Sequence, residues 1–238
     1  MKKQQVMSIL VAGLAVGLVG CSKAKTSQPT VAIYHQAKQG TQIWYEVPNH
    51  DKITKNTAIN SIIVLNNNNK ITQYSINGRK TVRSLDKYSN KRVLTLAKKW
   101  DIQNIEKNYD DMYGKNDNTG VLTTKYSKKE MVNRLRAAPT DNEFTIYENG
   151  SNKKIKKESM QFTSKQMENS IVRYDLTKPN QRFSINGNHF IGYLVTEHVD
   201  GATNTVSSKL IQRVSNKDKV AGFDSAKESG IKVKKVGN

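Results

Sequence analysis

The chain contains a single cysteine, Cys21, which directly follows a run of apolar residues. Residues 1–5 include two lysines, and the segment from Val6 to Val19 carries no charge. The thiolate is the side chain best suited to alkylation, and a lone cysteine has no partner for an intramolecular disulfide. The type and position of Cys21 therefore indicate covalent modification of its sulfur.

A basic start, an apolar run and small residues at its end are typical of a secretory signal. The fourteen uncharged residues span about 21 Å as a helix, which is short for a hydrocarbon core of about 30 Å. The segment Leu18-Val19-Gly20-Cys21 resembles the lipobox of bacterial lipoproteins. The resemblance implies that a diacylglycerol is joined to Cys21, that residues 1–20 are a cleaved signal peptide, and that the lipid holds the protein on the outer face of the cell membrane.

Other residue types offer no recognisable catalytic set. Ser84 and Lys87 have the Ser-x-x-Lys spacing, but no Lys-Thr-Gly completes a penicillin-binding motif. The histidines lack the His-Glu-x-x-His spacing, and the expected strand carrying His189 and His198 places them on opposite faces. We therefore expect no enzyme, no cofactor and no bound metal.

The charge is the strongest remaining signal. The net charge is +19, and loss of residues 1–20 removes two lysines and no acids, leaving +17. Such a charge favours an anionic partner, and secretion argues against nucleic acid. We expect contact with the membrane through the lipid on Cys21 and with teichoic acid or another anionic wall polymer; compositional drift toward Lys and Asn is an open alternative.

Four lysines give this charge a candidate location. Lys153, Lys154, Lys156 and Lys157 follow a predicted Asn149-Gly150 turn and place charge on both faces of one predicted strand. A central strand could not bury such a pattern, so we expect an exposed edge strand. These four residues are the candidate polyanion-binding site.

The remaining patterns predict an α+β fold, with antiparallel sheet(s) and two or three helices. Strands are expected at 41–47, as a hairpin over 59–76, as a second hairpin over 143–162, and near 171–176, 181–186, 189–199 and 205–214. A helical pattern over 93–112 changes face near Asp101, which predicts either a helix buried on two sides or a break capped by that residue, and we favour the break. Ser127 and Glu130 form a capping box for another helix that ends before Pro139.

The predicted organisation has four parts. Residues 1–20 are the signal peptide and 21–38 the lipidated cysteine with a polar tether, although a short helix ending near Gly40 is also indicated. Residues 39–138 would form an α+β lobe and 139–238 a mostly antiparallel β lobe, with a single body as the alternative. No heptads are present, so we expect a monomer.

Several stretches together resemble small, basic surface lipoproteins of lactobacilli and related Gram-positive bacteria. They are AKQGTQIWYEV, KNTAINSIIVLNNNNKITQYSI, LAKKWD and GNHFIGYLVTE. The resemblance implies a surface location and transfers no activity or site residue. The leading expectation is thus a membrane-anchored extracellular lipoprotein that binds an anionic envelope component or an envelope protein. The alternatives are a ligand-binding lipoprotein of a transport system and, third, an envelope enzyme.

Overall fold

The computed structural model describes residues 30–113, 125–165, 167–203, 205–220 and 222–236. Within these ranges the helices are α1 (Ile33–Gln39), α2 (Val82–Leu85), α3 (Asn90–Tyr113) and α4 (Lys128–Leu135). The strands are β1 (Thr30–Val31), β2 (Gln42–Pro48), β3 (Ala58–Leu65), β4 (Lys70–Thr81), β5 (Thr140–Asn149), β6 (Ile155–Ser164), β7 (Ser170–Ile185), β8 (Asn188–Val199), β9 (Val206–Val214), β10 (Lys219–Val220) and β11 (Lys232–Val236). The predicted signal peptide, Leu18, Val19, Gly20 and Cys21 lie outside the described residues.

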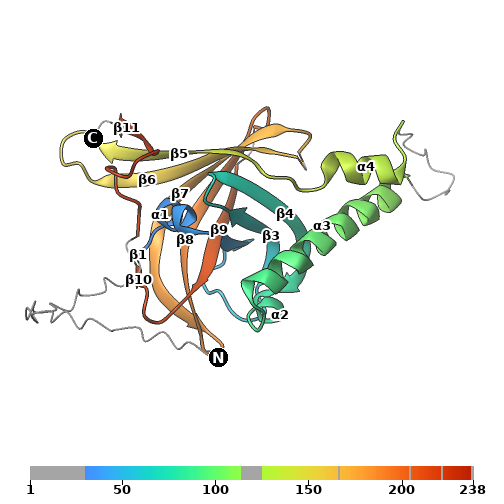
Figure 1. Cartoon of the computed structure of the whole chain (residues 1–238), viewed down its shortest axis with the longest axis horizontal. Helices are drawn as coiled ribbons and strands as arrows, with labels where there is room; N and C mark the ends of the chain where they lie inside the picture. The colour runs from blue at the N-terminus through green and yellow to red at the C-terminus, as the bar shows by residue number, and fades with distance from the viewer. Residues whose placement is uncertain (1–29, 114–124, 166, 204, 221, 237–238) are drawn as a thin grey trace, which may run out of the picture.

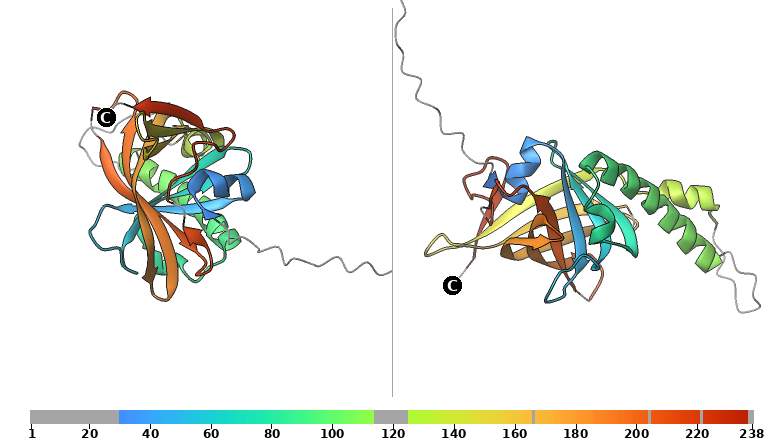
Figure 2. Two further views of the ribbon diagram at one scale, coloured as in Figure 1. Left: turned by 90° about the vertical axis from the view of Figure 1, so that its left-hand side faces the viewer. Right: turned by 90° about the horizontal axis from the view of Figure 1, so that it is seen from below.

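Eight consecutive strands, β2 to β9, form an antiparallel sheet that closes on itself (Figure 1 and Figure 2). Each strand pairs with its neighbours in the sequence, and β9 pairs back with β2. Closure gives almost every strand a partner on both sides, which satisfies the backbone groups that an open edge would expose. The α+β expectation is confirmed in its coarse form, but the sheet dominates the described ranges and four helices accompany it there.

The closed sheet has one narrow seam, between β4 and β5. Only Lys70 and Ile71 of β4 pair with Asp141 and Thr140 of β5. The three helices α2, α3 and α4 are inserted in the chain at this point, and α3 packs beside β4 while α4 lies against α3 (Figure 1 and Figure 2).

Asp101 of α3 stabilises the seam. Its side chain is buried, and its two carboxylate oxygens accept hydrogen bonds from the Ser75 N–H at 3.2 Å and the Ala137 N–H at 2.8 Å. The predicted helix break at Asp101 is wrong, because α3 runs without interruption through this residue. Asp101 instead accepts hydrogen bonds from backbone groups of neighbouring segments.

The core lies on both sides of the sheet. The interior cluster draws at least one residue from each strand of the closed sheet: Trp44, Ile63, Ile71, Phe144, Met160, Tyr174, Tyr193 and Leu210 are among them. A second cluster lies outside, where α2 and α3 cover Ile43, Tyr45 and Val47 of β2. β2 matches the strand expected at 41–47 to within one residue, and both of its faces are buried.

The ranges 39–138 and 139–238 do not form separate lobes. The closed sheet interleaves them, since β2 pairs with β9 and β4 pairs with β5. The predicted tether 21–38 is also too long, because Ile33, Tyr34 and Ala37 of α1 are buried in the interior cluster. A single shared core is the physical reason for both corrections.

Predictions of individual turns, caps and strands agree with the structure better than the predicted division into lobes does. The hairpin turn before β4 contains Asn69 with φ of 53°, a left-handed conformation that asparagine tolerates. Ser127 caps α4 and forms the predicted capping box with Glu130. The two strands expected near 171–176 and 181–186 are joined in β7, with register shifts between Thr177 and Phe183.

Candidate functional site

The four lysines predicted as a polyanion site lie at the turn between β5 and β6. Lys153 and Lys154 are in the turn, and Lys156 and Lys157 are in the first residues of β6. The first three are exposed, whereas Lys157 is partly buried. β6 is not an edge strand along its length, because it pairs with β5 and, from Glu158 onward, with β7.

A second lysine-rich segment lies next to this turn. β11 pairs in parallel with β5, from Lys232 opposite Thr145 to Val236 opposite Asn149. The Gly150 N–H of the turn donates to the Val236 carbonyl at 3.1 Å. Paired residues that are 87 positions apart in the sequence are thereby brought side by side at one end of the molecule (Figure 1).

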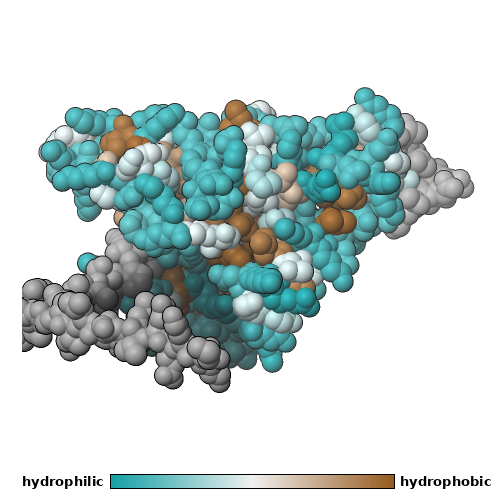
Figure 3. All heavy atoms as spheres, viewed as in Figure 1, coloured by the Kyte–Doolittle hydropathy of each residue, from teal (hydrophilic) through white to brown (hydrophobic). Residues whose placement is uncertain are grey.

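We call this surface the basic end and define it by Lys153, Lys154, Lys156, Lys234 and Lys235, all exposed. Tyr147 of β5 lies between the start of β6 and β11, since its ring centroid lies 4.5 Å from the Lys157 Nζ and 5.9 Å from the Lys234 Nζ. Hydrophilic residues cover most of the surface above β5, β6 and β11 (Figure 3).

β11 was not predicted from the sequence. The run KVKKV has β-forming valines among its lysines that could have signalled a second lysine-rich strand. Its partner strand, however, depends on a pairing that no local pattern encodes.

Two nearby lysines are compensated by acids. Lys232 Nζ lies 2.5 Å from the Glu143 carboxylate, and Lys157 Nζ lies 2.7 Å from that of Asp175. Lys157 is therefore not the simple solvated lysine that the sequence predicted. The excess positive charge belongs to the exposed lysines of the turn and of β11.

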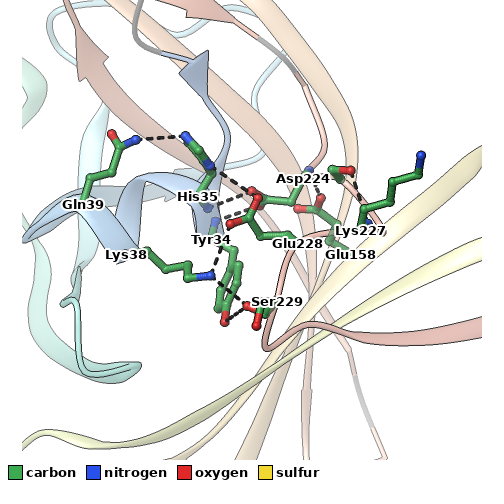
Figure 4. Close-up of polar contacts among 10 residues, drawn as sticks. Tyr34, His35, Lys38, Gln39, Glu158, Asp224, Lys227, Glu228 and Ser229 are labelled. Atoms are coloured by element: carbon green, nitrogen blue, oxygen red, sulfur yellow. Dashed lines mark hydrogen bonds and ion pairs between the residues drawn. The ribbon is translucent and has the colours of Figure 1, made fainter.

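A polar cluster holds α1 against the segment that leads into β11 (Figure 4). The carboxylate of Asp224 accepts the backbone N–H groups of Tyr34 at 2.7 Å and His35 at 2.8 Å. The Tyr34 hydroxyl and the Lys38 ammonium both donate to the Ser229 carbonyl, at 3.0 and 2.8 Å. Because β11 begins three residues after Ser229, this cluster helps to place the lysines of β11.

Two buried carboxyls meet in the same cluster. The Asp224 N–H donates to Glu158, whose second carboxyl oxygen is buried and has no hydrogen-bond partner among the described residues. Burial, reinforced by the charge of Asp224, raises the pKa of Glu158 well above its ordinary value. Burial also raises the pKa of Asp224, to about 6, against the lowering effect of its two N–H donors. At neutral pH we therefore assign the proton to Glu158 and the negative charge to Asp224.

A third polar group lies inside the closed sheet. Glu46 accepts hydrogen bonds from Ser61 at 2.5 Å, Tyr174 at 3.1 Å and Ser208 at 2.9 Å. Burial and the neighbouring Glu46 raise the pKa of Glu197 to about 7. The surrounding interior is filled by the apolar side chains of the core, so these groups lie in packed protein.

The histidines of β8 take separate places, as the sequence predicted. His198 lies on the outer face of the sheet with its Nε2 3.3 Å from Asp175, whereas the neighbouring Glu197 is turned inward. His189 contacts the hydroxyl of Ser184 through its Nδ1 at 3.0 Å. Glu197 and His198 therefore do not act together.

Comparisons of the chain with protein-family models, with curated proteins and with solved structures found no match. Among the helices of the described ranges, none has the length and apolar character needed to span a membrane.

Proposed function

We propose that the protein is a membrane-anchored extracellular lipoprotein that binds an anionic wall polymer, such as teichoic acid, through its basic end. The observation that carries the proposal is the pairing of β11 with β5, which adds Lys234 and Lys235 to the lysines of the β5–β6 turn. The lipobox-like segment ending at Cys21 supports the anchor, and the charge of +17 after its cleavage supports an anionic partner.

The buried acids hold parts of the fold together, which agrees with a binding function rather than a catalytic one. Asp224 caps α1, Asp101 bonds two backbone amides at the seam, and Glu46 is bonded by three hydroxyls. Each of these carboxylates thus stabilises the fold. The lysines of the basic end are instead exposed, so a flexible polyanion can reach them.

The basic end suits a repeating anion better than a single small one. Exposed charges interact over a Debye length of about 8 Å at physiological salt, so neighbouring lysines act together on adjacent charges of a polymer. Each contact is weak, and the sum depends on the number of lysines and on salt. We therefore expect binding that weakens steeply as the salt concentration rises.

The test compares two quadruple variants of the mature lipoprotein in nonionic detergent. The first changes Lys153, Lys154, Lys234 and Lys235 to Gln. The second removes the same charge from exposed positions of α3 and α4 by changing Lys91, Lys98, Lys99 and Lys129 to Gln. Binding to purified, immobilised teichoic acid is measured over a range of salt concentrations.

We expect the first variant to bind at least tenfold more weakly at low salt and to lose much of its salt dependence, as for lysines acting near an anionic surface. The second variant should lose much less affinity and keep most of its salt dependence. Equal losses of affinity in the two variants would show that net charge alone matters. Unchanged binding in the first variant would refute the proposal that the basic end binds the polymer. Capture of an envelope protein instead of polymer would favour the alternative partner.

A further inference from the structure

Three basic side chains converge on one acid on the outer face of the closed sheet. Lys157 of β6, Arg173 of β7 and His198 of β8 surround Asp175 of β7. Their Nζ, Nε and Nε2 atoms lie 2.7, 3.2 and 3.3 Å from the Asp175 carboxylate. The sheet register explains this convergence, because Arg173 is opposite His198 while Asp175 lies two residues along the same face.

The cluster has more positive charge than its carboxylate can neutralise. Lys157 and Arg173 alone outnumber Asp175, and a protonated His198 would add to the excess. Two acids lie further along this face: Glu143 is opposite Gln161, which is opposite Arg173, and Asp200 lies two residues beyond His198, with its N–H bonded to the Ile171 carbonyl. Glu143 is itself paired with Lys232. Among the described residues, Asp175 is thus the acid that forms ion pairs with Lys157, Arg173 and His198, while Asp200 lies nearby without pairing with them.

The burial pattern presents cations to solvent and hides the anion. The Asp175 side chain is 9% exposed, whereas those of Lys157, Arg173 and His198 are 31%, 39% and 34% exposed. An arriving anion would thus meet the three basic groups before the carboxylate. Because Asp175 already holds these side chains in place, binding would cost little side-chain entropy.

Donor groups for an anion are available. The Arg173 Nε lies 3.2 Å from the Asp175 Oδ1 in an ion pair that lacks hydrogen-bond geometry, and no ion pair of its Nη atoms is found among the described residues. A guanidinium presents paired N–H groups in a planar fork that matches two oxygens of a phosphate. Lys157 uses one of its three N–H donors on Asp175 and also faces the Tyr147 ring, which leaves a donor for a second oxygen.

We propose that Lys157, Arg173 and His198 form a phosphate-binding site, organised from beneath by Asp175. A phosphate ester or diester would be bound by the Arg173 fork and the Lys157 ammonium, with the His198 imidazole at the side. This inference deepens the proposed function. Lys157 follows Lys156 of the basic end, so the site would seat one phosphate of a polymer whose other charges contact the turn lysines.

The test uses sn-glycerol 1-phosphate as the probe and the ¹⁵N-labelled mature lipoprotein in nonionic detergent. Titration is followed through the side-chain signals of Arg173 and His198. Arg173→Gln is compared with Arg92→Gln, which removes an exposed arginine of α3. Arg173→Lys keeps the charge but not the fork, and it serves if the Gln variant does not fold.

We expect saturable shifts at both side chains at millimolar probe, with affinity roughly fivefold lower in Arg173→Gln and in Arg173→Lys and unchanged in Arg92→Gln. Inorganic phosphate should compete, whereas uncharged glycerol should not. Absence of shifts at Arg173 and His198, or equal affinity in all variants, would overturn the proposal. If the probe fails while the lysines of the basic end still control teichoic acid binding, the proposed function stands and this site does not.

Discussion

Replacing Glu158 with Gln tests the assignment of a proton to a buried carboxyl. The substitution keeps an oxygen that can accept the Asp224 N–H and removes the ability to ionise. In the native protein, burial raises the pKa of Glu158 well above its ordinary value of 4.5, so the folded state retains a proton that the unfolded chain releases. Unfolding therefore releases a proton, and the free energy of unfolding falls as pH rises.

The size of this effect follows from proton linkage. Glu158 should lower the free energy of unfolding by about 1.4 kcal/mol for each pH unit between its unfolded and folded pKa values. Over two such units the wild type should lose about 2.7 kcal/mol relative to Glu158→Gln. Asp224 and Glu197, with pKa values raised to about 6 and about 7, add the same sign of dependence in both proteins. The difference between the proteins isolates Glu158.

Urea unfolding of both proteins between pH 5 and 8, followed by the fluorescence of the buried Trp44, measures this difference. Glu168→Gln, at an exposed position, is the matched control and should follow the wild type. The reasoning is refuted if Glu158→Gln has the same pH slope as the wild type, because Glu158 would then be ionised in the folded protein.

The other predictions concern the seam, the approach to β11, and the anchor. Asp101→Ala leaves the N–H groups of Ser75 and Ala137 without their acceptor, at about 1–3 kcal/mol each, so urea unfolding should show a loss of roughly 2–6 kcal/mol. Gly230 has φ of 93°, and a Cβ there would overlap the Tyr34 hydroxyl. Gly230→Ala should therefore loosen β11 and speed amide exchange in that strand. Unchanged amide exchange would contradict the close packing of Gly230 against Tyr34. Cys21→Ser should abolish fatty-acid labelling and membrane attachment, and equal labelling would end the lipoprotein interpretation. The mature chain should sediment as a monomer, and a stable dimer would contradict this.

Short-range patterns account for most of the elements. Alternating residues identified β2, asparagine-rich turns marked the hairpins, and the spacing of Ser127 and Glu130 marked the start of α4. These features depend on contacts between residues close in sequence, so they can be recognised from the sequence itself. The error at Asp101 has the opposite origin, because its acceptors serve amides of β4 and of the segment after α4.

The candidate sites needed distant pairings. The sequence alone determined an abundance of lysine, a cluster at 153–157, and a lipobox-like cysteine with no disulfide partner. Only the tertiary structure placed β11 beside that cluster and brought Lys157, Arg173 and His198 around Asp175. The physical reason is that strand partners and register are selected by burial of the whole core. Composition supplies the charges, whereas closure of the sheet determines which of them become neighbours.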